Sequence, residues 1–195
     1  MKKKIKKEFR EISIVASIFL LLYFTGLHTE VAAFAQRVIL TTGLITADTD
    51  SDPTTYEDVD YNFKLKNLNG EFTDLSEYKG KVVFINIWAT WCPPCVAEMP
   101  NIQSLYDKIE NDNIEFIMLS MDNSEEKAKK FIDKKGFTFP VFMAASKVPA
   151  MFRAPSIPTT FVISRKGKVV SKKVGMANYD KKKFKTFLEE LANTE

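Results

Sequence analysis

The chain has 195 residues, 45% of them hydrophobic, which is enough apolar material for one folded domain and an additional segment. The net charge of +3 is concentrated at one end, because residues 1–47 hold seven Lys and Arg against three acidic residues, leaving 21 basic and 22 acidic residues in 48–195. A near-neutral globular part argues against a nucleic-acid partner. The two cysteines, Cys92 and Cys95, lie far from the only histidine, His28, which excludes a Cys/His metal cluster.

The N-terminal segment combines a lysine cluster in residues 1–11 with an uncharged apolar run in residues 12–27. A basic flank before an apolar run is typical of an export signal or of a membrane anchor whose basic end stays in the cytoplasm. These 16 residues would span about 24 Å as a helix, against a hydrocarbon core of ~30 Å, and a helix starting near Phe9 closes the gap. We expect residues 12–30 to be an uncleaved transmembrane anchor. One alternative is a signal peptide cleaved near Ala33-Phe34-Ala35. The other, a buried helix of a soluble domain, fits the lysine cluster poorly.

Residues 31–60 connect this anchor to the rest of the chain. Hydrophobicity resumes over Val31–Ile45, and Glu30 and Arg37 would share one side of a helix there. We therefore expect a juxtamembrane amphipathic helix along the membrane surface. A second crossing would have to bury Arg37 and would return the domain to the cytoplasm. Residues 47–60 are acidic and lack an apolar period, which indicates a flexible linker.

From Tyr61 onwards the pattern is that of a compact domain. Residues 81–88 are apolar on both alternations, as expected for a central strand that is covered on both faces. The predicted elements, in chain order, are a hairpin around Asn69-Gly70, the strand over 81–88, a helix over about 93–111, a strand over 114–120, a helix over 124–135, a short strand over 140–143, a helical turn near 149–153, a hairpin of 159–164 with 168–174, and a final helix from Asp180. Strands separated by helices predict an α/β fold with a central mixed sheet and helices on both faces.

Both cysteines lie in the segment Trp91-Cys92-Pro93-Pro94-Cys95, between the central strand and the next helix. A Cys-x-x-Cys pair at a helix start brings its sulfurs within disulfide distance and puts the first at the positive end of the helix dipole. Thiolates are stabilised in that position, so we expect Cys92 to be the exposed nucleophile and Cys95 to resolve the mixed disulfide. The alternatives, an idle cysteine pair or half a zinc site, fit the strand-to-helix context poorly.

Three neighbours are expected to tune this dithiol. Pro93 suits the first helical turn, and Pro94 removes a further N–H donor to the Cys92 sulfur, which favours a reducing couple over an extreme oxidant. Glu98 follows Cys95 by three residues and shares its helical face. Partial burial would raise the pKa of Glu98 and allow its carboxylate to accept the Cys95 proton. The alternative for Glu98 is a solvated acid that interacts favourably with the helix dipole.

Four motifs extend this pattern along the chain. They are Asp74-Leu75-Ser76-Glu77-Tyr78-Lys79-Gly80-Lys81, the run from Phe84 to Cys95, Glu98-Met99-Pro100, and Ile157-Pro158-Thr159-Thr160-Phe161. Together they resemble the thioredoxin superfamily and, within it, the membrane-tethered or exported TlpA/ResA-like thiol–disulfide oxidoreductases. The resemblance covers about residues 61–195, which are therefore expected to form a thioredoxin-like domain.

The resemblance implies roles for residues outside the dithiol. Pro158 would be the family's cis-proline, in a loop that packs against the dithiol and pairs with substrate backbone. The residues expected to contact substrate are Trp91, Pro93, Pro94, Ile157 and Pro158. Asn86 stands where thioredoxin has a buried Asp, as in the TlpA/ResA branch, where an acid at the Glu98 position is the usual companion.

The predicted function is reduction of protein disulfides outside the cytoplasmic membrane, with no cofactor besides the redox-active disulfide of Cys92 and Cys95. We expect a monomer with a single-pass anchor and its domain on the outer or periplasmic side, or export after signal cleavage. Its partners would be disulfide-bearing proteins and a membrane electron donor. A peroxiredoxin-like peroxidase is disfavoured because residues 85–92 lack a Pro-x-x-x-Thr-x-x-Cys frame. A copper chaperone is disfavoured because no histidine lies near the cysteines.

Overall fold

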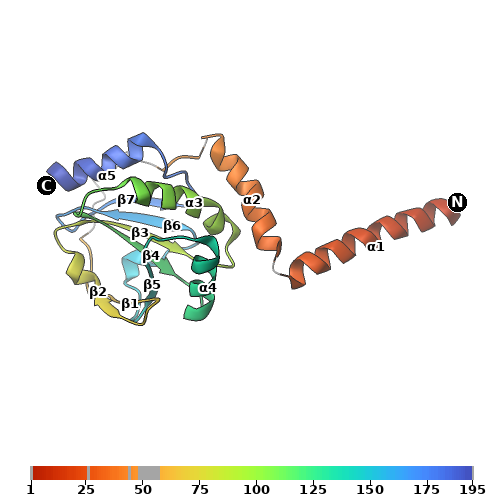
Figure 1. The fold of residues 1–195 in the computed structure, drawn as a ribbon, viewed down its shortest axis with the longest axis horizontal. Coiled ribbons are helices and arrows are strands. Elements are labelled where there is room, and N and C mark those ends of the chain that lie inside the picture. Colours follow the sequence, from red (N-terminus) through yellow and green to blue (C-terminus); the bar gives the residue numbers. More distant parts are fainter. Residues whose placement is uncertain (1, 26, 44, 48–57, 195) are drawn as a thin grey trace.

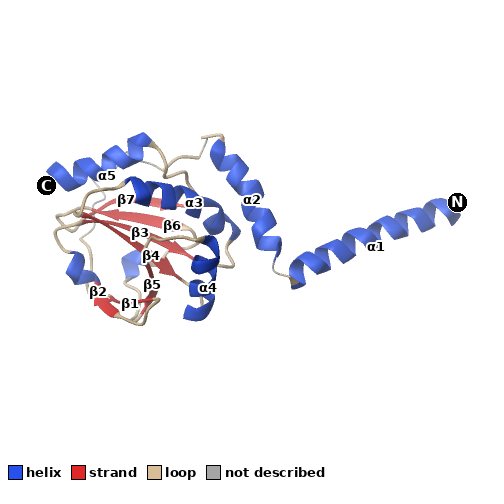
Figure 2. Ribbon diagram, in the orientation of Figure 1, coloured by secondary structure: helices blue, strands red, loops and turns tan. Residues whose placement is uncertain are grey.

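The fold is taken from a computed structural model that describes residues 2–25, 27–43, 45–47 and 58–194. Its domain is built on a seven-stranded mixed sheet with the order β2-β1-β5-β4-β3-β6-β7 (Figures 1 and 2). The strands are β1 (Lys64–Asn67), β2 (Phe72–Asp74), β3 (Val82–Trp88), β4 (Ile114–Ser120), β5 (Val141–Ala144), β6 (Thr159–Ile163) and β7 (Val169–Val174). Central β3 pairs in parallel with β4 and antiparallel with β6, so the predicted mixed sheet is confirmed.

Helices cover both faces of this sheet, as predicted. The α-helices are α1 (Lys2–Phe24), α2 (Leu27–Thr41), α3 (Pro93–Lys108), α4 (Glu125–Lys135) and α5 (Lys182–Thr194), and the 3₁₀ helices are η2 (Leu75–Tyr78) and η3 (Ala150–Phe152). Side chains of α3, α4 and α5 pack in one core cluster, and side chains of η2 and η3 pack in a second cluster. The predicted order of strands and helices along residues 61–195 therefore holds, with ends that differ by a few residues.

The pleat of β3 decides which of its side chains face α3. All seven residues of this strand are buried. Val82, Phe84 and Trp88 belong to the cluster with α3 and α5, whereas Val83 and Ile85 belong to the cluster with η2 and η3. Because side chains alternate along a strand, Asn86 lies on the α3 side. A polar residue is thereby placed in the core beneath the Cys-x-x-Cys helix.

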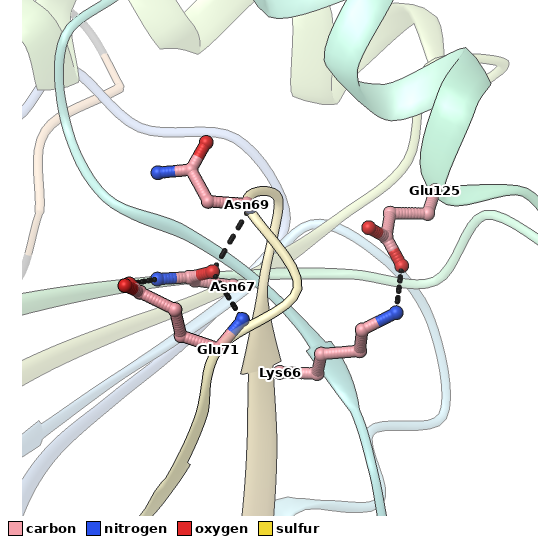
Figure 3. Close-up of polar contacts among 5 residues, drawn as sticks. All are labelled: Lys66, Asn67, Asn69, Glu71 and Glu125. Atoms are coloured by element: carbon pink, nitrogen blue, oxygen red, sulfur yellow. Dashed lines mark hydrogen bonds and ion pairs between the residues drawn. The ribbon is translucent and has the colours of Figure 1, made fainter.

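The β1–β2 hairpin closes through side chains as well as backbone (Figure 3). The Asn67 side-chain oxygen accepts two backbone N–H groups of the turn, at 2.9 and 3.0 Å, and its amide donates to Glu71 Oε2 at 2.7 Å. Gly70 adopts a φ of +90°, a conformation that a residue with a Cβ rarely adopts. Lys66 forms a 2.7 Å ion pair with Glu125 at the start of α4. The two side chains are 33% and 34% exposed, so the pair adds at most about 1 kcal/mol to stability.

The two N-terminal helices differ in their relation to the domain. In Figure 1, α1 projects away from the sheet and α2 lies beside α3. No single helix among the described residues is long and apolar enough to cross a membrane, but Arg10–Phe24 and Leu27–Thr41 meet that criterion as a pair bent by 97°. Most large apolar side chains described in α1 are exposed.

Helix α2 presents one side to the domain and the opposite side outward. Ala33 and Leu40 are buried in a cluster with Val96 and Ala97 of α3. Val31, Phe34, Val38 and Ile39 are exposed on the other side. The helix that the sequence predicts on the membrane surface packs on the domain in the structure, through the small Ala33 and the aliphatic Leu40.

The predicted linker falls largely on residues 48–57, which lie outside the described residues. Asp58 and Val59 attach the chain to the turn between β6 and β7. The Val59 N–H donates to the Gly167 carbonyl at 2.9 Å, and Asp58 forms a 2.6 Å ion pair with Lys168.

Candidate active site

The two cysteines form a disulfide at the N-terminus of α3, with an S–S distance of 2.08 Å. Cys92 is the N-cap of α3, and its sulfur accepts the Cys95 N–H at 3.3 Å. Pro93 and Pro94 fill the first two helical positions and carry no N–H, so the Cys95 amide is the first backbone donor that the helix offers to this sulfur. In the reduced protein the same N–H and the helix dipole would stabilise a Cys92 thiolate.

The prediction of an exposed Cys92 is wrong for the disulfide form. Cys92 is 4% exposed and Cys95 is 0% exposed. The Ile157 carbonyl oxygen lies 3.7 Å from the Cys92 sulfur, which carries no proton in a disulfide, so this is a packing contact rather than a hydrogen bond. The loop that contains Ile157 therefore covers Cys92, although Cys92 is still the more accessible cysteine of the pair.

The expected substrate-facing residues surround this disulfide in sequence and, in part, in space. Trp91 is 60% exposed, and Pro93, Pro94 and Ile157 are partly exposed. The Ile157–Pro158 peptide bond is cis, as the resemblance implied. Pro158 itself is buried, and its carbonyl accepts the Gly175 N–H at 2.9 Å. These positions are compatible with a docking surface, and their contact with substrate remains a prediction.

Glu98 is completely buried, at 0% exposure, so the alternative of a solvated acid is wrong. Its Oε1 accepts a hydrogen bond from Asn86 Nδ2 at 2.8 Å, and its Oε2 accepts one from the Ala177 N–H at 2.9 Å. Burial raises the pKa of Glu98 to about 8, an increase that the Ala177 and Asn86 hydrogen bonds partly offset. A carboxyl with this pKa is able to take up and release a proton near neutral pH.

A chain of buried polar groups continues from Glu98 into the core. Asn86 Nδ2 also donates to Thr160 Oγ1 at 2.9 Å, and the Tyr179 hydroxyl donates to the same oxygen at 2.6 Å. The Asn86 Oδ1 atom has no hydrogen-bond partner among the described residues. Asn86 and Thr160 belong to the motifs noted in the sequence, but Tyr179 and the Ala177 amide were missed. A backbone N–H leaves no side-chain signal, and Tyr179 looks like any core aromatic residue.

Asp122 is a second buried acid, which no motif in the sequence indicated. It accepts hydrogen bonds from the Thr90 N–H at 3.0 Å, the Thr90 hydroxyl at 2.7 Å and the Ser120 hydroxyl at 2.9 Å. These bonds tie the end of β4 to the loop directly before Trp91. Asp122 therefore holds the approach to the Cys-x-x-Cys turn in place.

Comparison with known proteins places this site in a family. A model described as "AhpC/TSA family" matches residues 58–172, more than half of the chain. The chain belongs to the AhpC/TSA family. Among curated relatives, the thiol-disulfide oxidoreductase ResA of Bacillus anthracis is 37% identical over 115 residues, which cover 58% of this chain and 66% of the relative. ResA of Geobacillus thermodenitrificans is 29% identical over 187 residues, which cover 95% of this chain and 98% of the relative.

Solved structures of thiol–disulfide proteins also resemble this AhpC/TSA family member. StoA from Bacillus subtilis is 28% identical with a TM-score of 0.54, covering 64% of this chain and 94% of StoA. A protein assigned as thiol:disulfide interchange protein DsbE from Chlorobium tepidum is 25% identical with a TM-score of 0.61, covering 71% of this chain and 100% of that protein. The predicted resemblance to ResA-like thiol–disulfide oxidoreductases is confirmed. The first group of ResA relatives is matched over 66% of its length, slightly under two thirds.

The oxidised protein is expected to lose stability as the pH rises from 5 to 8. The folded state keeps Glu98 protonated up to about pH 8, whereas the unfolded chain ionises it near 4.5, so the folded state binds more protons in this window. This contribution is fully present below the unfolded pKa and is lost as the pH rises through the folded pKa. The loss amounts to about 3 kcal/mol between pH 5 and 8. Urea unfolding at both pH values measures it, and an equal pH dependence in Glu98→Gln would contradict the assignment.

Proposed function

We propose that this protein is a thiol–disulfide oxidoreductase that reduces disulfide bonds in other proteins through Cys92 and Cys95. The observation that carries the proposal is the cysteine pair at the N-terminus of α3, closed as a disulfide, with the buried carboxyl of Glu98 three residues further along the same helix. The names of the ResA relatives support the same reaction class. The site offers a nucleophile, a resolving thiol and a proton acceptor within the N-cap and the first two turns of one helix.

The proposed reaction starts from the dithiol form. The Cys92 thiolate attacks one sulfur of the substrate disulfide, the substrate S–S bond breaks, and the first substrate sulfur leaves and takes up a proton. Glu98 accepts the proton of Cys95, and the Cys95 thiolate attacks the Cys92 sulfur of the mixed disulfide. The second substrate sulfur leaves and is protonated, with Glu98 as the proton source. The substrate gains two electrons and two protons, and the enzyme ends as the disulfide seen in the structure.

We also propose that the domain of residues 61–195 acts on the outer side of the cytoplasmic membrane, attached through residues 12–30. The support is the lysine cluster before an apolar helix and the exposed apolar side chains of α1. The alignment with the Geobacillus thermodenitrificans ResA extends over 95% of this chain, so the N-terminal region is shared with that relative. In this location a membrane electron donor would return the disulfide to the dithiol.

A Cys95→Ala variant is expected to hold its substrates as mixed disulfides. Without the resolving thiol, the bond between Cys92 and the substrate sulfur has no internal attacker, so the intermediate accumulates. Affinity purification of the full chain from membranes, followed by non-reducing gels and mass spectrometry, identifies the attached proteins. The matched control is Cys92→Ala with Cys95 intact. Glutathione adducts without any attached protein would argue against a dedicated protein substrate.

The Cys92–Cys95 couple is expected to be more reducing than the strongest oxidants of this fold, which lie at about −120 mV. Because Pro93 and Pro94 carry no N–H, the Cys95 N–H is the helix backbone donor to the Cys92 sulfur. The dipeptide also contains no histidine to stabilise a thiolate further. Equilibration with glutathione or dithiothreitol buffers, read by thiol alkylation, gives the potential. A value near −120 mV would show that this explanation of the Pro-Pro dipeptide is wrong.

A further inference from the structure

The loop between β7 and α5 connects the buried carboxyl to the N-terminal helices. The Ala177 N–H donates to Glu98 Oε2 at 2.9 Å. The next residue, Asn178, is held by the segment that follows α2: its N–H donates to the Ile45 carbonyl at 3.0 Å, and Thr46 forms an isolated parallel β-bridge with it. Asn178 Nδ2 reaches the Leu40 carbonyl at 3.4 Å. The loop that carries the Ala177 N–H is therefore held in place by the end of α2 and by Ile45 and Thr46, which precede the domain.

Helix α2 also covers the turn of α3 that carries the catalytic groups. Leu40 is buried against Val96 and Ala97, the two residues between Cys95 and Glu98. Met176, next to Ala177, packs at the edge of the same cluster. Figure 1 shows α2 along the side of α3. One helix outside the sheet thus contacts both the turn that holds Glu98 and the loop that donates to it.

We propose that α2 is a positioning element of the active site: through the packing of Leu40 and the hydrogen bond from Asn178 to the Leu40 carbonyl, it keeps the Ala177 loop closed over Glu98 and water away from its carboxyl. The proposal rests on the proposed oxidoreductase function, in which Glu98 exchanges a proton with Cys95. Its consequence is that the membrane-proximal helix controls how readily Glu98 holds that proton. Displacing α2 would hydrate the carboxyl and favour its charged form, whereas loss of the Ala177 hydrogen bond would act the other way. We expect hydration to dominate, because burial is the largest cause of the raised pKa.

The other ionisable groups around Glu98 do not account for its raised pKa. The dithiol shares its helix, and Tyr179 lies two residues beyond Ala177. Asp180 on the same loop is paired with Lys108 and Ser104. On the inward side of α2, Glu30 is paired with Lys135, and Arg37 is half-buried. No charged side chain contributes to the raised pKa of Glu98, whose main cause is burial. Access of water is therefore the property that α2 is able to change.

The packing of α2 is sensitive to a single substitution. Two polar atoms on its inward side, Gln36 Oε1 and Arg37 Nε, are buried and have no hydrogen-bond partner among the described residues. Unpaired buried polar atoms oppose docking, so the apolar contact of Leu40 has to outweigh them. Replacing Leu40 by glutamine removes that contact and adds a further polar group to the interface.

The experiment uses the full reduced chain in lipid nanodiscs and measures the rate of reaction with a small aromatic disulfide from pH 5 to 9. The inflection that disappears in Glu98→Gln is assigned to Glu98. In Leu40→Gln we expect it to move down by about one pH unit or more, toward the ordinary range of a carboxyl. The matched control is Ile39→Gln, the neighbouring residue on α2, which is 46% exposed and should keep the wild-type inflection. Leu40→Met should also keep it.

Two further measurements distinguish a folding defect, a failure of the α2 proposal and a failure of the proposed function. If Leu40→Gln does not fold, Asn178→Ser replaces it, since serine retains an acceptor for the Asp180 N–H but is too short to reach the Leu40 carbonyl. An unchanged inflection in a folded Leu40→Gln or Asn178→Ser would overturn the proposal. A wild-type chain that shows the inflection yet reduces no protein disulfide would refute the proposed function alone, because the small disulfide reports on the dithiol and Glu98 without a protein substrate.

Discussion

Replacing Cys92 by alanine is expected to reduce the insulin-disulfide reductase activity of the protein to background. Cys92 supplies the attacking sulfur, and Cys95, at 0% exposure, has no path to a protein disulfide in its place. The turbidity assay of insulin reduction with dithiothreitol as electron source measures the rate. Circular dichroism of the variant should match that of the reduced wild type, because the Cys92 side chain fills little of the core.

The same samples distinguish the competing functions. Peroxide consumption and copper retention are measured on wild type and Cys92→Ala beside insulin reduction. The proposal predicts that insulin reduction is the activity lost with Cys92. Peroxide consumption that depends on Cys92, without insulin reduction by the wild type, would support the peroxidase instead. Stoichiometric copper retention without either activity would support a copper chaperone.

Replacing Glu98 by glutamine is expected to lower the disulfide-reduction rate at pH 7 by about 100-fold. The variant cannot accept the Cys95 proton, so resolution of the mixed disulfide slows. In the wild type, deprotonated Glu98 is the active form, and its pKa of about 8 makes the rate rise with pH through that value. The variant should lack this rise. Stopped-flow reduction of a peptide disulfide between pH 6 and 9 records both the rate and its pH dependence.

The glutamine variant is expected to fold, which makes the comparison informative. Asn86 Oδ1 has no hydrogen-bond partner among the described residues, so rotation of its amide offers an acceptor to the new side-chain NH₂. The Ala177 N–H keeps its acceptor in the glutamine oxygen. A variant with wild-type rate, wild-type pH dependence and unchanged cysteine titrations would show that Glu98 is a structural group without a part in proton transfer.

The sequence alone predicted the features that depend on short stretches of chain. The apolar pattern of residues 81–88 predicted β3, and the Asn69-Gly70 turn predicted the first hairpin. The position of Cys92-Pro93-Pro94-Cys95 after that strand predicted a dithiol at a helix start. Each depends on periodicity or spacing within about ten residues, where the backbone geometry of strands and helices fixes which side chains are neighbours.

The site was less predictable where its contacts join distant parts of the chain. Three-residue spacing placed Glu98 near Cys95, but its full burial depends on Asn86, 12 residues away, and on the Ala177 amide, 79 residues away. Local pattern likewise suggested an exposed Cys92, which the Ile157 loop, 65 residues later, covers in the disulfide form. Burial and desolvation are sums over all neighbours in space, so the pKa of a carboxyl is not a property of its own segment.

Helix α2 shows most clearly the difference between what the sequence predicts and what the tertiary structure decides. Its amphipathic sequence determined that it would be a helix with one apolar and one mixed side. The tertiary structure alone decided that the side carrying Ala33 and Leu40 packs on α3 and that Asn178 meets the Leu40 carbonyl. The physical reason is that periodicity selects which residues share a face, whereas the partner of that face depends on complementary surfaces more than 50 residues away in the chain, as from Leu40 to Val96.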